Sequence, residues 1–226
     1  MMTYHEPPFR NRVDAGRILA DSLKQYRSSD SLVFAIPRGG IPVAVEVAKK
    51  LGSNLDIIVP RKIPIPDNPE AGYGAVTEDG VIVLNELLVR QLGFTRQQIE
   101  RHAEEVRAEI RRRQAVYRTI LMASSVGGKT AIIVDDGLAS GYTMVAAIRS
   151  IRQQGAATVV AAAPVASSHA WELIKSSADD VVSAVISHDY PFAVASFYRH
   201  WHDLTDEEVI RDLEGFMKDY RGHASD

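Results

Sequence analysis

Two acidic residues and two hydroxyl residues follow one short apolar stretch of the chain. Asp135 and Asp136 come directly after residues 131–134, and Ser140 and Thr143 follow shortly after them. Carboxylates accept hydrogen bonds from sugar hydroxyls, whereas hydroxyl side chains and the backbone N–H groups of a helix start donate to phosphate. The order of these residues therefore predicts a site for a phosphorylated ribose.

A strand and a helix must position these groups. Residues 131–134 are apolar and rich in β-branched side chains, as in a buried parallel strand. From about Gly141, apolar residues recur at helical spacing: Met144, Val145, Ile148 and Ile151. The glycines at 137 and 141 would let the backbone approach an anion closely. The alternative is an acidic pair that merely precedes an ordinary helix.

Residues 131–143 resemble the phosphoribosyl-pyrophosphate (PRPP) signature of type I phosphoribosyltransferases. That signature is an apolar strand, two acids, a short loop, a small hydroxyl residue, Gly, one residue, and Thr or Ser. The resemblance implies that Asp135 and Asp136 hold the ribose hydroxyls. It also implies a loop around the 5′-phosphate, made of Gly137, Ala139, Ser140, Gly141, Tyr142 and Thr143.

A second loop of similar design lies earlier in the chain. Residues 31–36 indicate a strand, Pro37-Arg38-Gly39-Gly40 follow, and residues 41–51 indicate a helix. Gly39 and Gly40 allow close approach of the backbone to an anion, and the Arg38 fork suits a diphosphate. In the family that this sequence resembles, the matching loop binds pyrophosphate. A tight turn with a surface arginine is the alternative.

A third segment predicts a lid. Residues 55–59 indicate a strand, and Arg61 and Lys62 follow it. The prolines and glycines of residues 63–74 exclude helix and most sheet, so residues 63–80 are expected to form a mobile loop. Lys62 resembles the family's pyrophosphate-binding cation, although a solvated cation pair is the alternative. Next to the lid, residues 74–76 and 81–84 flank a hairpin turn.

The remaining pattern predicts a layered fold. Helices are expected over 11–26 and 95–118, and strands over 158–165 and 181–186. Repeated strand–helix units indicate an α/β fold with a mostly parallel sheet flanked by helices, and such sheets bind ligands at the carboxyl ends of their strands. We interpret the basic run in 107–118 as a solvated helix face, because acidic residues are interleaved with it.

The chain is predicted to be one phosphoribosyltransferase domain, residues 1–226, with a core of about 31–190. Residues 1–30 and 190–226 would form a small hood. Aromatic residues are dense in 187–202, which predicts either a flap packed on the core or a surface that stacks on a planar acceptor. Thr205 and Glu208 have the spacing of a capping box for a last helix.

Composition excludes several classes of protein. The chain has 226 residues, a net charge of −3 and no cysteine, which excludes disulfides and thiolate chemistry. It has neither an apolar run of membrane-spanning length nor a signal pattern at the N-terminus. We expect a cytoplasmic protein without a membrane partner, and nothing in its charge favours nucleic acid.

The resemblance implies transfer of 5-phosphoribosyl from PRPP to a nitrogenous base or related amine, with release of pyrophosphate. Arg38, Lys62, Asp135 and Asp136 would be catalytic, with Mg²⁺ as the cofactor and indirect metal contacts from Asp135 and Asp136. A homodimer is also implied. Ala139 stands where 6-oxopurine enzymes usually carry Asp, so the acceptor stays open. The alternatives are a PRPP-binding regulatory protein without turnover, and a phosphoacceptor that uses the acidic pair.

Overall fold

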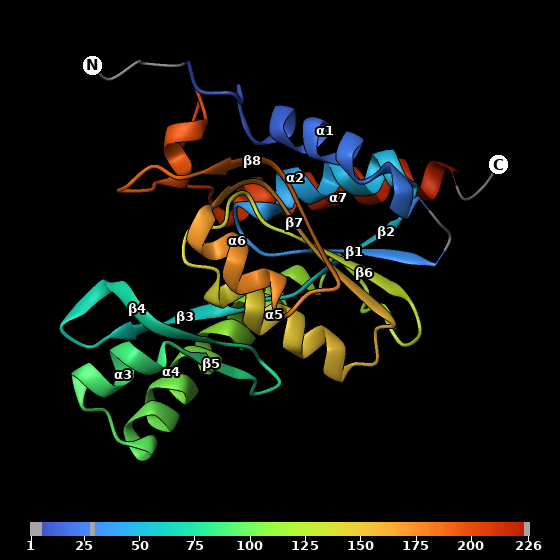
Figure 1. Ribbon diagram of the computed structural model, residues 1–226. Coiled ribbons are helices and arrows are strands. Elements are labelled where there is room, and N and C mark those ends of the chain that lie inside the picture. Colours follow the sequence, from blue (N-terminus) through green and yellow to red (C-terminus); the bar gives the residue numbers. More distant parts are fainter. Residues whose placement is uncertain (1–5, 28–29, 224–226) are drawn as a thin grey trace.

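The main sheet of the protein is parallel and five-stranded. The computed structural model describes residues 6–27 and 30–223. The strands lie in the order β2-β1-β6-β7-β8, and every neighbouring pair is parallel (Figure 1). Their bounds are β1 Ser31–Ala35, β2 Asn54–Ile57, β6 Thr130–Val134, β7 Thr158–Ser167 and β8 Asp180–Ser187. The predicted parallel sheet is therefore confirmed.

Helices cover both faces of this sheet, as the strand–helix pattern predicted. Helices α1 (Arg12–Ser22), α2 (Gly40–Leu51) and α7 (Asp206–His223) share one apolar cluster, and α5 (Tyr142–Gln153) and α6 (Ser168–Lys175) share another. Along β1, Val33 belongs to the first cluster and Phe34 to the second, because successive side chains of a strand point to opposite faces.

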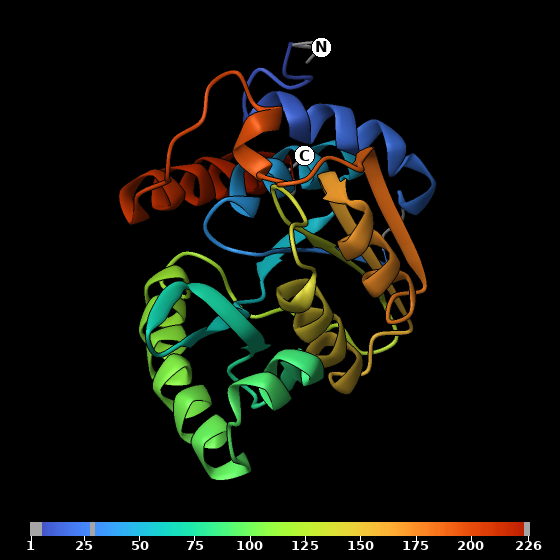
Figure 2. The same cartoon turned by 60° about the vertical axis from the view of Figure 1, so that its left-hand side comes forward.

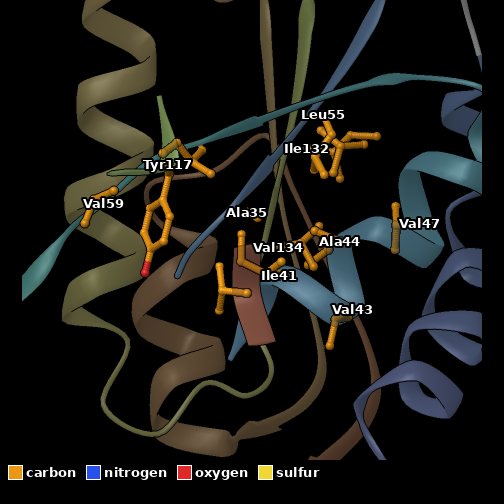
Figure 3. Packing of buried hydrophobic residues seen from close by; sticks show 14 of the residues in the cluster. Ala35, Ile41, Val43, Ala44, Val47, Leu55, Val59, Tyr117, Ile132 and Val134 are labelled. Atoms are coloured by element: carbon orange, nitrogen blue, oxygen red, sulfur yellow. The ribbon is translucent and has the colours of Figure 1, made fainter. Parts of the chain in front are cut away.

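The first cluster is packed tightly between α2 and the sheet. Ile41 and Ala44 of α2 lie against Ala35 and Val134 of the central strands (Figure 3). Tyr117 belongs to the same cluster, and its hydroxyl lies at the edge of the cluster. The carboxyl ends of β1 and β6 are thus held rigidly beside each other.

The direction of strand addition reverses between β1 and β6. From β1 the chain adds β2 on one side, and later adds β6, β7 and β8 on the other. The helices that follow β1 and β6 consequently lie on opposite faces, and sheets of this kind bind ligands beyond the carboxyl ends of the strands at such a point. Both glycine-containing loops begin there, because Pro37 follows β1 and Asp135 follows β6.

A second, small sheet overturns one expectation. Strands β3 (Arg61–Ile65), β4 (Asn68–Val76) and β5 (Ile82–Leu84) form an antiparallel sheet where residues 63–74 were expected to avoid regular structure. The strand register shifts on both sides of Pro64, and such an irregularity accommodates a residue that lacks an N–H donor. The hairpin predicted around 77–80 is confirmed by the pairing of β4 with β5.

The small sheet lies between α5 and a helical arm. The arm consists of α3 (Glu86–Leu92) and α4 (Arg96–Tyr117), and it stands apart from the large sheet in Figure 2. On α4, Arg107 and Arg111 both pair with Glu104, which agrees with a solvated, charge-balanced face. His102 Nδ1 is 2.9 Å from the Tyr73 hydroxyl, so this histidine has a structural partner.

Helix starts follow local sequence signals. Asn85 accepts a hydrogen bond from the backbone N–H of Leu88, and Thr95 forms a capping box with Gln98. Thr205 and Glu208 form the same reciprocal pair at the start of α7, with distances of 2.9 and 3.2 Å. The capping box predicted for Thr205 and Glu208 is confirmed.

The two ends of the described chain meet beside the sheet. Phe9 pairs with Tyr198 as a parallel bridge, and short 3₁₀ helices η1 (Lys24–Tyr26) and η2 (Val194–Phe197) belong to these ends. Residues 1–5, 28–29 and 224–226 of the expected hood lie outside the described residues. In the part of the chain that the structure describes, no helix has the length and apolar character needed to cross a bilayer.

Candidate functional site

The two glycine-containing loops touch each other beyond the carboxyl ends of β1 and β6. A β-carbon built on Gly39 would lie 1.9 Å from Asp136 Oδ2, and one on Gly40 would lie 2.6 Å from the Val134 carbonyl oxygen. The Ile36 N–H also donates to Val134 O at 2.9 Å. Gly39 and Gly40 were expected to let an anion approach the backbone. In the structure they also let the second loop pack against the first, because a side chain at either position would collide with it.

The acidic pair is partly buried and internally bonded. The backbone N–H of Asp136 donates to Asp135 Oδ1 at 2.9 Å. Burial and the Asp136 carboxylate raise the pKa of Asp135 well above its usual value. Burial also raises the pKa of Asp136, although the Arg12 guanidinium opposes that shift. Two carboxylates so placed favour a ligand that donates hydrogen bonds, such as a sugar diol.

Arg12 reaches this pair from the first residue of α1. Its Nε donates to Asp136 Oδ2 at 2.8 Å, and its Nη1 donates to the His202 carbonyl oxygen at 2.9 Å. The guanidinium carbon lies 3.7 Å from the centroid of a Trp201 ring, which is a cation–π contact. The Tyr198 hydroxyl donates to the Asp136 carbonyl oxygen at 2.6 Å. The end segments of the chain thus build one wall around Asp136.

The predicted phosphate loop is anchored at Leu138 and opens at its tip. Leu138 bridges to β7 in parallel register, and the Ser167 hydroxyl donates to the Ala139 carbonyl oxygen at 2.7 Å. Ala139 and Ser140 are exposed. Gly141 has φ of 83° and precedes α5 without a side-chain cap, so the first N–H groups of α5 can serve an anion.

The Arg38 side chain lies next to the start of the last helix. Its Nη1 is 3.8 Å from Asp206 Oδ1, and the Tyr117 hydroxyl donates to that same oxygen at 3.0 Å. Burial and the hydrogen bond to Asp206 raise the pKa of Tyr117 to about 12. Sequence reasoning placed Arg38 in the crevice, but it did not find the carboxylate partner from α7.

Arg61 is a second arginine in this region. Its Nη1 is 3.2 Å from Glu109 Oε2, yet this buried atom makes no aligned hydrogen bond with the described residues. We treat the contact as an ion pair without hydrogen-bond geometry. Burial and the charges of Arg113 and Arg38 lower the pKa of Arg61. Arg38, Arg61 and Arg113 thus form a group of neighbouring cations suited to a multiply charged anion.

Lys62 points away from this group. It is exposed, and it pairs across the small sheet with Ala75, whose side chain belongs to the cluster around α5. Arg61 instead meets Glu109 of α4, because adjacent residues of a strand face opposite sides. The structure therefore places only one residue of this cation pair next to Arg38, and the role of Lys62 stays a prediction.

The donors around the acidic pair suit only an indirect magnesium site. Within residues 6–27 and 30–223, no group of three or more His, Cys, Asp or Glu side chains is arranged to hold a metal ion. Asp136 Oδ2 already binds Arg12. Mg²⁺ commonly keeps several waters and binds through one or two carboxylates and substrate phosphates. The acidic pair fits this indirect mode, and it does not form a complete protein cage.

Comparison with known proteins decides the family. The family model described as the phosphoribosyl transferase domain matches residues 10–199, which include both loops and the acidic pair. The chain belongs to the phosphoribosyl transferase family. The predicted family is therefore confirmed, and the cis peptide between Pro37 and Arg38 lies in the first loop of this phosphoribosyl transferase domain.

The chain is similar to proteins from Mycobacterium tuberculosis and Thermus thermophilus. Two provisionally named phosphoribosyl transferases of Mycobacterium tuberculosis, from strains CDC 1551 and H37Rv, are each 37% identical over 212 residues. These matches cover 94% of the chain but 48% of each relative, so the chain spans about half the length of these curated relatives. The crystal structure of TT1426 from Thermus thermophilus is 38% identical with a TM-score of 0.77, covering 92% of this chain and 98% of that one.

Sequence reasoning did not single out Arg12, Tyr198, Trp201 or Arg113 as parts of the site. Of these four, only Tyr198 and Trp201 belong to a local pattern, the dense aromatic residues of 187–202. Tyr198 is 5.4 Å from Phe9 and 5.1 Å from Trp201 between ring centroids, so this aromatic group packs within the protein. A cation far away in sequence, such as Arg12, leaves no local pattern that connects it with Asp136.

Proposed function

We propose that this phosphoribosyl transferase moves the 5-phosphoribosyl group of PRPP to a nitrogenous base or related amine and releases pyrophosphate. The contact between Gly39 and Asp136 carries the proposal, because it joins a diphosphate loop and a ribose-phosphate loop in one crevice. A ligand that is phosphorylated at both ends of a ribose matches these two loops. We expect one domain of 226 residues with the hood as part of it.

Each part of the crevice has a role in this proposal. The start of α5 and the Ser140 and Thr143 hydroxyls bind the 5′-phosphate. Asp135 and Asp136 accept hydrogen bonds from the ribose hydroxyls. Arg38 and its neighbour Arg61 stabilise the departing diphosphate, and Lys62 joins them only if the small sheet moves, because its side chain lies on the opposite face. Preorganised positive charge of this kind favours the transition state, where negative charge builds on the leaving group.

The bond changes are a displacement at the ribose. The bond from C1 to the diphosphate oxygen breaks, a bond from C1 to the acceptor nitrogen forms, and the departing pyrophosphate takes up the proton that the nitrogen loses. Mg²⁺ would arrive with PRPP and offset the charge of the diphosphate through retained waters near the acidic pair. The chain's own residues hold the diol and both phosphate ends, and exclusion of water prevents hydrolysis of PRPP.

The acceptor is proposed only as a class. Ala139 is exposed in the loop and replaces the Asp that 6-oxopurine enzymes usually carry, so we favour an acceptor other than hypoxanthine or guanine. We also expect a homodimer in the cytoplasm, as the family resemblance and the sequence suggested.

The test is ligand-dependent stability followed by turnover. Millimolar PRPP with Mg²⁺ should raise the melting temperature, because a ligand that binds only the folded protein stabilises it. A panel of nucleobases and related amines should then release pyrophosphate with one acceptor. Absence of a melting shift would reject the function. A shift without turnover for any acceptor would favour a PRPP-binding regulatory protein.

A further inference from the structure

The ion pair between Arg12 and Asp136 is more deeply buried than most ion pairs of this protein. The two side chains are only 8% and 14% exposed. Exposed pairs contribute little, whereas removing one partner of a buried pair leaves a poorly solvated charge. The ion pair therefore restricts the position of the Asp136 carboxylate within the site.

The guanidinium of Arg12 is fixed from several sides. The His202 carbonyl oxygen accepts from Nη1 at 2.9 Å, and the Trp201 ring lies 3.7 Å away. The helix beneath is also anchored, because Asn11 caps α1 by accepting from the Asp14 N–H at 3.0 Å. A planar group held by a ring and two hydrogen bonds has little freedom to turn.

Asp136 is confined in turn. Its carboxylate occupies the place where a side chain of residue 39 would begin, and Tyr198 donates to its carbonyl oxygen at 2.6 Å. Val194 of η2 approaches the next residue, since a β-carbon on Gly137 would lie 2.5 Å from Val194 Cγ1. The end segments of the chain thus determine where this carboxylate stands.

We propose that Arg12, held by Trp201, is a positioning residue that orients Asp136 to accept hydrogen bonds from the ribose hydroxyls. The proposal rests on the proposed function, because the diol belongs to PRPP. Arg12 acts through Asp136 and does not touch the phosphates. Positioning matters because an acceptor held in place binds a hydroxyl without first having to be ordered.

The test compares ligands that differ only in the diol. Calorimetry measures binding of ribose 5-phosphate, 2,3-dideoxyribose 5-phosphate and pyrophosphate to the wild type and to Arg12→Gln. The matched control is Arg17→Gln, because Arg17 also lies on α1 and its Nε is likewise 2.8 Å from a carboxylate, Glu46, but its side chain is 66% exposed.

The wild type should prefer ribose 5-phosphate to the dideoxy sugar by about tenfold or more, since hydrogen bonds to charged groups are strong. In Arg12→Gln this ratio should fall toward one, while pyrophosphate affinity stays at the wild-type value. Arg17→Gln should keep the wild-type ratio. A folded Arg12→Gln variant that keeps the ratio, or that loses affinity for all three ligands equally, would overturn the proposal.

Two further variants test the proposal if Arg12→Gln does not fold. Arg12→Lys keeps the charge but loses the fork, and Trp201→Leu keeps the ion pair but removes the ring beside it. Both should show a reduced ratio, and an unchanged ratio in both would overturn the proposal. If the wild type binds neither sugar phosphate, the proposed function fails and the inference with it. If the wild type binds with discrimination that the variants keep, only the inference fails.

Discussion

Gly39 and Asp136 lie so close that position 39 has no room for a side chain. A β-carbon there would be 1.9 Å from Oδ2 and 2.4 Å from Cγ of Asp136. The two residues belong to loops after β1 and β6, which are neighbours in the sheet. The loop expected to take diphosphate and the acids expected to take ribose therefore share one surface.

Gly39→Ala should destabilise the protein and weaken PRPP binding. Inserting a methyl group into a packed contact costs about 1–3 kcal/mol, and the displaced carboxylate would no longer meet the diol. Chemical denaturation measures the free energy of unfolding. The control is Gly215→Ala in α7, where nothing would lie within 4 Å of an added β-carbon. That variant should gain roughly 0.5–1 kcal/mol, because alanine favours helix. Equal stability of the two variants would contradict the close contact.

Asp135→Asn should stabilise the ligand-free protein near neutral pH while it weakens PRPP binding. The folded-state pKa of Asp135 is raised above the ordinary value of 3.8, chiefly by burial. As the pH rises above 3.8, Asp135 loses its proton in the unfolded state before it does so in the folded state. The free energy of unfolding therefore falls until the pH passes the folded-state pKa. Each unit of elevation corresponds to about 1.4 kcal/mol.

Asparagine does not ionise, so the variant escapes this loss and can still accept from the Asp136 N–H. Denaturation curves from about pH 3 to pH 8 measure the difference. The two proteins should differ least at the acid end and most near neutrality. A stability difference that is independent of pH would argue against a raised pKa.

Arg38→Ala and Arg61→Ala should each weaken pyrophosphate binding more than ribose 5-phosphate binding. Both side chains lie in the cation group beside Tyr117, whereas the 5′-phosphate is expected at the start of α5. Loss of one charge-assisted hydrogen bond should cost about tenfold in affinity. Arg96→Ala is the control, because Arg96 is 93% exposed on α4. Equal losses for both ligands would reject this division between the loops.

The tip of the small sheet should exchange its amide hydrogens faster than its base. Residues 66–69 are exposed, whereas 73–76 are buried in the sheet. Local opening costs least where few apolar contacts hold the chain. PRPP with Mg²⁺ should protect residues 66–72, and Lys62→Ala should reduce that protection while α5 remains protected. Hydrogen exchange followed by mass spectrometry resolves these segments. Identical exchange at the tip with and without ligand would reject a gating lid.

Local patterns predicted the central strands and the capping box of the last helix, and other helix starts follow the same kind of signal. Asn85 and Thr95 cap helices because a short polar side chain meets the free N–H groups of the following turn. Such signals involve residues only a few positions apart, so they can be recognised in the sequence. Residues 63–74 were misjudged for a related reason. Proline and glycine disfavour strands locally, but a register shift at Pro64 and pairing with β5 let tertiary context prevail.

Patterns among neighbouring residues were enough to predict the parallel sheet, the acidic pair at a strand end and the small-residue loop before a helix. By contrast, the folded chain was needed to show that Arg12 binds Asp136, and that Arg61, rather than Lys62, lies near Arg38. These relationships join α1 with β6, and β3 with the loop after β1. They depend on helix packing and strand-face parity, which no local pattern records.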